Sequence, residues 1–133
     1  MDTALQNVVN HLEFFGFEIV PRENENSVLA RHAMHGSVFV KAYLGGVLLQ
    51  QYFRVNENVT TDRAGFLEAL NQLNSSAQLT TYVAGPTDDP HIRMDGLFLG
   101  MYDKKNFGAF LDAFLTDTGE RVLRNEQIRK YIS

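Results

Sequence analysis

Apolar residues recur at helical spacing in three segments of the chain. From Thr3 to Phe15 they stand three or four residues apart, which predicts an amphipathic helix. Gly16 follows directly and suits the left-handed conformation that ends helices, with Phe17 as the hydrophobic partner of that cap. The same spacing predicts helices from about Asp62 to Asn74 and from Asp103 onward. The apolar stripe of the last helix comprises Phe107, Phe110, Leu111, Phe114 and Leu115.

Polar residues mark the start of the second helix. Thr60 or Thr61 is the expected N-cap, because a short hydroxyl side chain can accept from the free N–H groups of the first turn. Asp62 then lies in the positive field of the helix start, where a carboxylate is stabilising. The buried face of this helix is expected to hold Leu67, Leu70 and Leu73, with Phe66 beside it.

The sequence does not determine where the last helix ends. Its expected N-cap is Asp103, and Val122 continues the apolar stripe if the helix tolerates Gly119. The segment from Asn125 to Ser133 then forms either further helix or a loose tail.

Five strands are predicted between the helices. The first three follow a turn formed by Pro21 and the polar run 22–26, and they are separated by His35-Gly36 and by Gly45-Gly46. Such short connections suit tight hairpins, because glycine accepts positive φ, and they permit only antiparallel neighbours. The predicted strands are Ser27–Met34, Ser37–Leu44, Val47–Val55, Gln78–Ala84 and His91–Tyr102.

The fifth predicted strand contains the dipeptide Asp95-Gly96. This dipeptide is a hairpin signal between apolar runs, but it also fits a bulge in one long bent strand. We favour the bulge, because Ile92 to Met94 is short for a strand of its own.

The element order is helix, three strands, helix, two strands, helix. Strands clustered in hairpins between helices predict an α+β fold, with a single antiparallel sheet of about five strands and helices packed on one face. We expect residues 1–133 to form one domain, because no linker or repeat interrupts the pattern.

The face of the sheet turned away from the helices is expected to be rich in large side chains. Alternation places Phe39, Lys41 and Tyr43 there from the second strand. The third strand adds Leu48, Gln50, Tyr52 and Arg54, and the fifth adds Phe98 and Tyr102. This face is either a solvated surface with cross-strand pairs or a partner surface, since aromatic residues and Arg are enriched at interfaces. The candidate partner-binding residues are Phe39, Tyr43, Leu48, Tyr52 and Arg54.

Composition narrows the function classes. The chain of 133 residues is 44% hydrophobic, has no cysteine and carries a net charge of −4. The lack of cysteine excludes disulfides and thiolate chemistry, and the negative charge argues against a nucleic-acid partner. No apolar run reaches the roughly 20 residues of a membrane helix. The polar, acidic start of the sequence argues against a secretory signal, so we expect a cytoplasmic protein without a membrane partner.

The sequence predicts no catalytic or metal site and no cofactor. His32 and His35 stand three apart at a strand end, which is expected to place them on opposite faces. His91 with Asp88 and Asp89 offers a cluster of zinc ligands, but a solvated turn explains the same residues. No serine stands in a Gly-x-Ser-x-Gly nucleophile elbow.

The element order of nearly the whole chain, together with one short motif, resembles a known family. The segment Phe66 to Asn74 ends in Leu-Asn-Gln-Leu-Asn and is followed by a strand pair and a phenylalanine-rich final helix. This arrangement resembles the bacterial sensory-transduction-regulator family of YbjN-type domains, whose plan is similar to the type III secretion chaperone fold. The resemblance implies an acidic homodimer that holds an extended protein segment along its surface. It has no catalytic signature, and this chain departs from it in the Gly85–Pro90 loop and at Asp95-Gly96.

These observations predict a non-enzymatic cytoplasmic protein-binding module, chaperone-like or regulatory, that holds a partner segment on its sheet face or edge. The alternative is a ligand-sensing domain with a small-molecule pocket between sheet and helices, marked by converging His91, Arg93 and Asp89. In a third hypothesis the apolar face is the contact of a homodimer.

Overall fold

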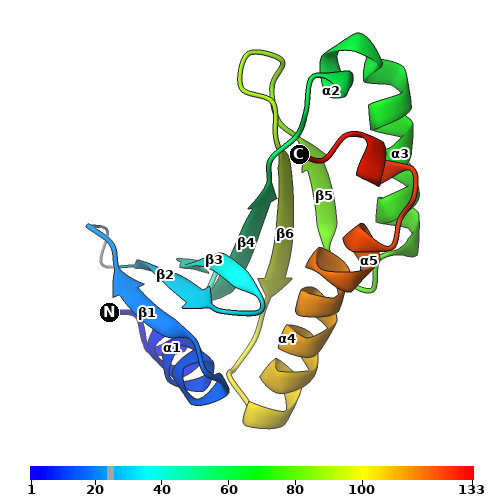
Figure 1. The fold of residues 1–133 in the computed structure, drawn as a ribbon. Coiled ribbons are helices and arrows are strands. Elements are labelled where there is room, and N and C mark those ends of the chain that lie inside the picture. Colours follow the sequence, from blue (N-terminus) through cyan, green and yellow to red (C-terminus); the bar gives the residue numbers. More distant parts are fainter. Residues whose placement is uncertain (24–25) are drawn as a thin grey trace. The chain divides into compact units, whose positions relative to one another are not determined.

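The computed structural model describes residues 1–23 and 26–133 and confirms an α+β protein with an antiparallel sheet (Figure 1). The six strands run in the order β1-β2-β3-β4-β6-β5. They are β1 (Glu18–Pro21), β2 (Ser27–His32), β3 (Gly36–Tyr43), β4 (Gly46–Phe53), β5 (Thr81–Ala84) and β6 (Ile92–Phe98). The helices are α1 (Thr3–Phe15), α2 (Asn58–Thr61), α3 (Arg63–Ser76), α4 (Lys104–Thr118) and α5 (Glu120–Leu123), with a short 3₁₀ helix η1 (Ile128–Lys130).

The strand that the sequence pattern missed is β1. It has only four residues and ends in Pro21, so it shows neither clear alternation nor a long apolar run. The turn predicted for 22–26 partly lies outside the described residues, because these omit 24 and 25.

The chain forms two compact units, each assembled from two stretches of sequence. Unit 1 comprises residues 1–50 and 96–112, and unit 2 comprises residues 51–95 and 113–133. Each unit has its own buried side chains, and each is described by itself below.

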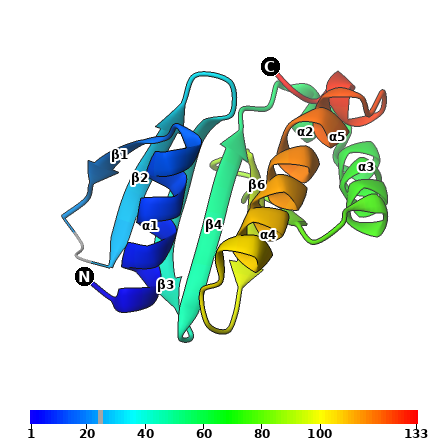
Figure 2. The ribbon, with the colours of Figure 1, turned by 90° about the horizontal axis from the view of Figure 1, so that it is seen from below.

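In unit 1, α1 packs against the inner face of the first strands (Figure 2). The helix matches its predicted bounds, and Asp2 caps it by accepting from the Leu5 N–H at 3.1 Å. At its end Gly16 has a φ of +111°, which confirms the predicted left-handed cap. Phe17 is buried, and its N–H donates to the Leu12 carbonyl. The side chains buried between α1 and the strands are Leu5, Val8, Val9, Leu12, Val28, Ala30, Val38, Val40, Val47 and Leu49.

The hairpin between β3 and β4 turns one residue earlier than predicted. Tyr43 pairs with Gly46, so the turn residues are Leu44 and Gly45, and both have positive φ. Gly46 is instead the first residue of β4, where a Cβ would collide with the carbonyl of Phe98. The second glycine of the pair is therefore required by close backbone approach, which a sequence cannot distinguish from turn chemistry.

The prediction that His32 and His35 lie on opposite faces is wrong. β2 ends at His32, and residues 33–35 reverse the chain, so the alternation of a strand no longer applies to His35. The two ring centroids lie 4.6 Å apart, and both rings contact Phe17. Burial and the neighbouring His32 lower the pKa of His35.

β6 is one continuous strand through Asp95 and Gly96, so the hairpin alternative at this dipeptide is wrong. The strand ends at Phe98, earlier than predicted. Phe98 packs against Phe107 and Phe110 of α4, with ring centroids 5.3 Å away in each case. Its predicted place on the face turned away from the helices is therefore wrong.

In unit 2, α3 begins after Asp62, whose side chain accepts from the Gly65 N–H at 3.2 Å. The predicted N-caps Thr60 and Thr61 belong instead to the single-turn helix α2. Leu67 is 43% exposed, contrary to prediction, because the helix faces its core with a stripe that includes alanine. The buried residues of α3 are Phe66, Ala69, Leu70 and Leu73.

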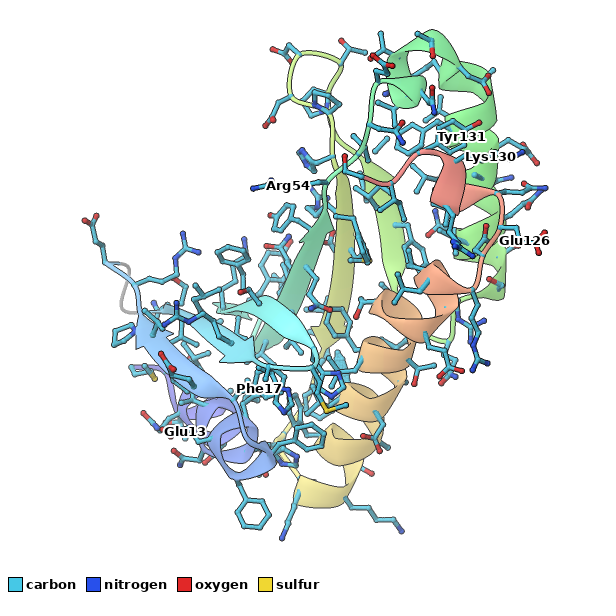
Figure 3. All side chains as sticks on the ribbon, viewed as in Figure 1. Glu13, Phe17, Arg54, Glu126, Lys130 and Tyr131 are labelled. Carbon is cyan, nitrogen blue, oxygen red and sulfur yellow. The ribbon has the colours of Figure 1, made fainter. Side chains whose placement is uncertain are left out.

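The C-terminal segment of unit 2 packs beside α3 (Figure 3). α4 ends at Thr118, Gly119 breaks the helix, and Val122 is buried from α5 instead. Beyond Asn125 the chain forms η1 and buries Ile128 and Tyr131. The Tyr131 hydroxyl donates to the Asp62 carboxylate at 2.8 Å, and this hydrogen bond raises the pKa of Tyr131.

Candidate protein-binding surface

The strands of unit 1 bury one face and leave the other partly accessible. Inward-pointing Val38, Val40 and Leu49 are fully buried. Alternate residues point the opposite way, because successive side chains of a strand face opposite sides of the sheet. We call this side the outer face. Its apolar members are Val20, Leu29, Phe39, Tyr43 and Leu48, and its polar members are Glu18, Ser27, Arg31, Ser37, Lys41 and Gln50.

Strand register joins these side chains into one patch. Leu29 stands opposite both Val20 and Phe39, and Lys41 stands opposite Leu48. Directly opposed side chains are near enough to touch. The apolar members are half-buried, except for Tyr43, which is 45% exposed. The outer face therefore contains a patch of apolar side chains that are partly accessible to solvent.

Cations border the apolar part of the outer face. The Arg22 guanidinium lies over the Phe39 ring, 4.8 Å from its centroid. Arg31 is neutralised by Glu18 at 2.6 Å. Among residues 1–23 and 26–133, no carboxylate forms an ion pair with Arg22 or Lys41. The patch thus carries positive charge that its described surroundings do not compensate.

The residues of the predicted site divide between the two units. Phe39, Tyr43 and Leu48 share the outer face of unit 1. Tyr52 and Arg54 belong to unit 2, where Tyr52 is 47% exposed and its ring lies 5.5 Å from that of His91. Figure 3 shows Arg54 at the end of β4, and its carbonyl accepts from the Ser133 N–H.

The sequence reading missed three members of the surface. Alternation in the first predicted strand is sufficient to place Leu29 on the outer face. Val20 was hidden because β1 was not recognised. Arg22 had no sequence signal, since its position over Phe39 depends on the pairing of β1 with β2 and of β2 with β3.

The edge strand β5 in unit 2 is closed by side chains. The Asn74 amide accepts from the Tyr82 N–H at 2.8 Å and donates to the Tyr82 carbonyl at 2.9 Å. This pair of bonds reproduces what a neighbouring strand would make. The last residue of the Leu-Asn-Gln-Leu-Asn segment therefore blocks strand addition at β5.

A buried carboxylate binds the backbone N–H groups of the three residues that precede β5. Asp117 is fully buried and accepts from the N–H groups of Gln78, Leu79 and Thr80 at 3.0 to 3.1 Å. Arg121 donates to it at 2.9 Å. Burial by itself would raise the pKa of Asp117, but these backbone and guanidinium donors lower it below its ordinary value. Residues 78–80, predicted as strand, are held by this carboxylate instead.

At the other end of the sheet order, the edge strand β1 pairs only with β2 among the described residues. Three of its four residues carry an N–H group, since Pro21 has none. Short length and a terminal proline are features by which natural edges limit unwanted pairing.

The residues of the ligand-sensing alternative have other partners. The Arg93 guanidinium lies on the Asp95 carboxylate at 3.0 to 3.1 Å. The His91 Nδ1 lies 2.9 Å from the Asp89 carbonyl oxygen. A separate open hollow in unit 1, with a volume near 480 Å³, is lined by Thr3, Ala4, Asn7, Leu44, Gly45, Gly100, Met101 and Tyr102.

Comparison with solved structures finds a protein of the same architecture. The crystal structure of YbjN, "a putative transcription regulator from E. coli", matches with a TM-score of 0.77. The match covers 100% of this chain and 97% of that chain at 12% sequence identity. This chain has the YbjN fold. The resemblance drawn from the sequence is thereby confirmed for the fold.

The YbjN match reaches no further than the fold, because so few residues are identical. Neither protein-family models nor curated protein sequences match the chain. Within the described residues, no helix is long and apolar enough to cross a membrane.

Proposed function

We propose that this chain is a non-catalytic, cytoplasmic binding module, chaperone-like or regulatory, that holds an extended segment of a protein partner. The segment lies on the outer face of unit 1 or pairs with the open edge at β1. The observation that carries this proposal is the apolar patch of Val20, Leu29, Phe39 and Leu48, which the strands assemble and leave half-accessible. Contiguous exposed apolar surface commonly marks an interaction site.

The two sheet edges favour the same location. A partner strand needs free backbone groups, and at β5 the Asn74 amide occupies the N–H and C=O of the central residue Tyr82. β1 has a strand neighbour on one side only among the described residues, and it borders the patch through Val20. The matching solved structure is described as "a putative transcription regulator", and a binding role for this chain is compatible with that description.

Tyr52 and Arg54 form a second proposed contact, to be tested separately from the outer face. Both are exposed, and they lie in unit 2. Single substitutions at each unit therefore distinguish a partner that needs one surface from a partner that needs both.

The test uses immobilised random peptides as probes and compares the wild-type chain with Tyr43→Ala. Loss of an exposed aromatic anchor is expected to weaken the selected peptides about tenfold. Leu67→Ala is the matched control, because Leu67 has a similar exposure of 43% but lies on α3. Tyr52→Ala measures the contribution of unit 2.

Three outcomes would overturn the proposal. Equal binding by Tyr43→Ala and wild type, with the fold intact by circular dichroism, would exclude the outer face. A homodimer that Tyr43→Ala dissociates in light scattering would identify the occupant as a second copy of the chain. A thermal shift with metabolites that is lost on changing the residues of the unit 1 hollow would favour the ligand-sensing alternative.

A further inference from the structure

We infer that the partner segment is acidic and amphipathic, with a carboxylate between two apolar side chains at alternate positions. This inference rests on the proposed function and specifies the chemistry of its partner. Phe39, Lys41 and Tyr43 are successive outward residues of β3, so the outer face presents an apolar, a cationic and an apolar group in a row. A partner that matches this row must present the complementary order.

The spacing of an extended segment fits this row. Outward residues of a strand recur every second position, about 7 Å apart. An extended peptide lying along β3 has the same repeat, so its alternate side chains meet Phe39, Lys41 and Tyr43 in turn. A helical segment would place its facing side chains three and four residues apart and would match the row less well.

The charges of the outer face favour a carboxylate over a neutral group. Among the cations on and beside the outer face, Arg31 is already paired with Glu18, whereas no carboxylate of the described residues forms an ion pair with Arg22 or Lys41. Arg22 stands over Phe39 and Lys41 stands beside Leu48, so both cations adjoin apolar side chains. Both cations are exposed, so a carboxylate that pairs with either of them forms a charge-assisted hydrogen bond at the surface, beside apolar side chains that can bind the neighbouring residues of the segment.

The negative net charge of the chain limits the places where an acidic segment can bind. The protein carries −4 overall, so it repels acidic segments at long range. An acidic segment can therefore bind tightly only where local cations outweigh that repulsion. Lys41 and Arg22 supply such a place on the outer face, and partners without the matching apolar side chains gain nothing from it.

The experiment measures the affinity of three synthetic peptides by fluorescence anisotropy. Each has leucines at two outward positions and threonines between, and the central outward residue is glutamate, glutamine or lysine. The glutamate peptide is expected to bind about tenfold more tightly than the glutamine peptide, and the lysine peptide more weakly still. The preference is expected to shrink as ionic strength rises.

Lys41→Glu is the decisive variant, because it should reverse the order of the glutamate and lysine peptides. Lys105→Glu is the control, since Lys105 is exposed in the first turn of α4 and should leave the order unchanged. Equal affinities of the three peptides overturn the inference. If Tyr43→Ala still weakens all of them, the proposed function survives without it.

A glutamate peptide that fails to bind also overturns the inference. In that case, random-peptide signals that depend on Tyr43 would keep the outer face as a binding surface of other specificity. Loss of both results would overturn the inference and the proposed function together.

Discussion

The two edge strands of the sheet differ in whether side chains occupy the outward backbone groups. In unit 2, the outer side of β5 is occupied by the Asn74 amide, and Asp117 holds the three N–H groups before it. In unit 1, β1 has no second strand beside it in the described part of the chain. An unpaired edge invites strand addition, so a protein usually covers it or keeps it short. This chain uses the first solution at β5 and the second at β1.

The comparison distinguishes an edge whose backbone groups are hydrogen-bonded by side chains, at β5, from an edge that can still pair with another strand, at β1. Closing β5 requires a buried carboxylate and an amide placed from two different helices, α4 and α3. β1 is limited only by its four residues and Pro21. The edge that is left open is also the one that adjoins the apolar outer face, which makes unit 1 the better candidate for partner binding.

Removing the closing carboxylate should have the largest effect. Asp117→Ala leaves three N–H groups and the Arg121 guanidinium without their acceptor, so we expect a loss of about 3 kcal/mol in the free energy of unfolding. Urea denaturation measures this loss. Arg124→Ala is the control, because its pair with Glu120 is exposed and should contribute less than about 1 kcal/mol.

The pH dependence of wild type and of the isosteric variant Asp117→Asn sharpens this prediction. Because the pKa of Asp117 is depressed in the folded state, its contribution is complete above the unfolded value of about 3.9 and is lost as pH falls through the folded pKa. The stability gap between wild type and Asp117→Asn should therefore be constant near neutral pH and shrink below about pH 4. A gap that is independent of pH would show that the carboxylate charge is not what closes the edge.

Opening the closed edge should have an intermediate effect. Asn74→Ala removes both bonds to Tyr82, and we expect a loss of about 1–2 kcal/mol in urea denaturation. Self-association in light scattering should rise, because β5 then resembles an open edge. Asn71→Ala, one turn earlier and exposed, should change neither property. If the two variants behave alike, Asn74 does not protect β5.

Adding an N–H donor to the open edge should have the smallest effect on stability. Pro21→Val adds an N–H donor and a strand-favouring side chain to β1, so the free energy of unfolding should change by less than about 0.5 kcal/mol. Peptide capture or self-association should nevertheless increase, as measured by anisotropy and light scattering. Pro90→Val, an exposed proline outside any strand, is the matched control. An unchanged association would indicate that β1 is not available for pairing.

Local pattern determined much of this protein in advance. The helix from Thr3 to Phe15, its Gly16 cap and the antiparallel class follow from spacing and turn chemistry between near neighbours. Alternation likewise placed Phe39, Tyr43 and Leu48 on one face, because the period of a strand is fixed by its backbone.

Other features were decided by contacts between distant segments. Nothing local predicts that Asp117 accepts from residues 78–80, since the donors lie more than 30 positions away in sequence. Nothing local predicts either that Tyr52 belongs to a different compact unit from Leu48, because both residues lie on the same strand. A sequence fixes which groups must be buried or paired, because that depends on their chemistry. Which partner satisfies each group depends on where the folded chain brings its remote parts together.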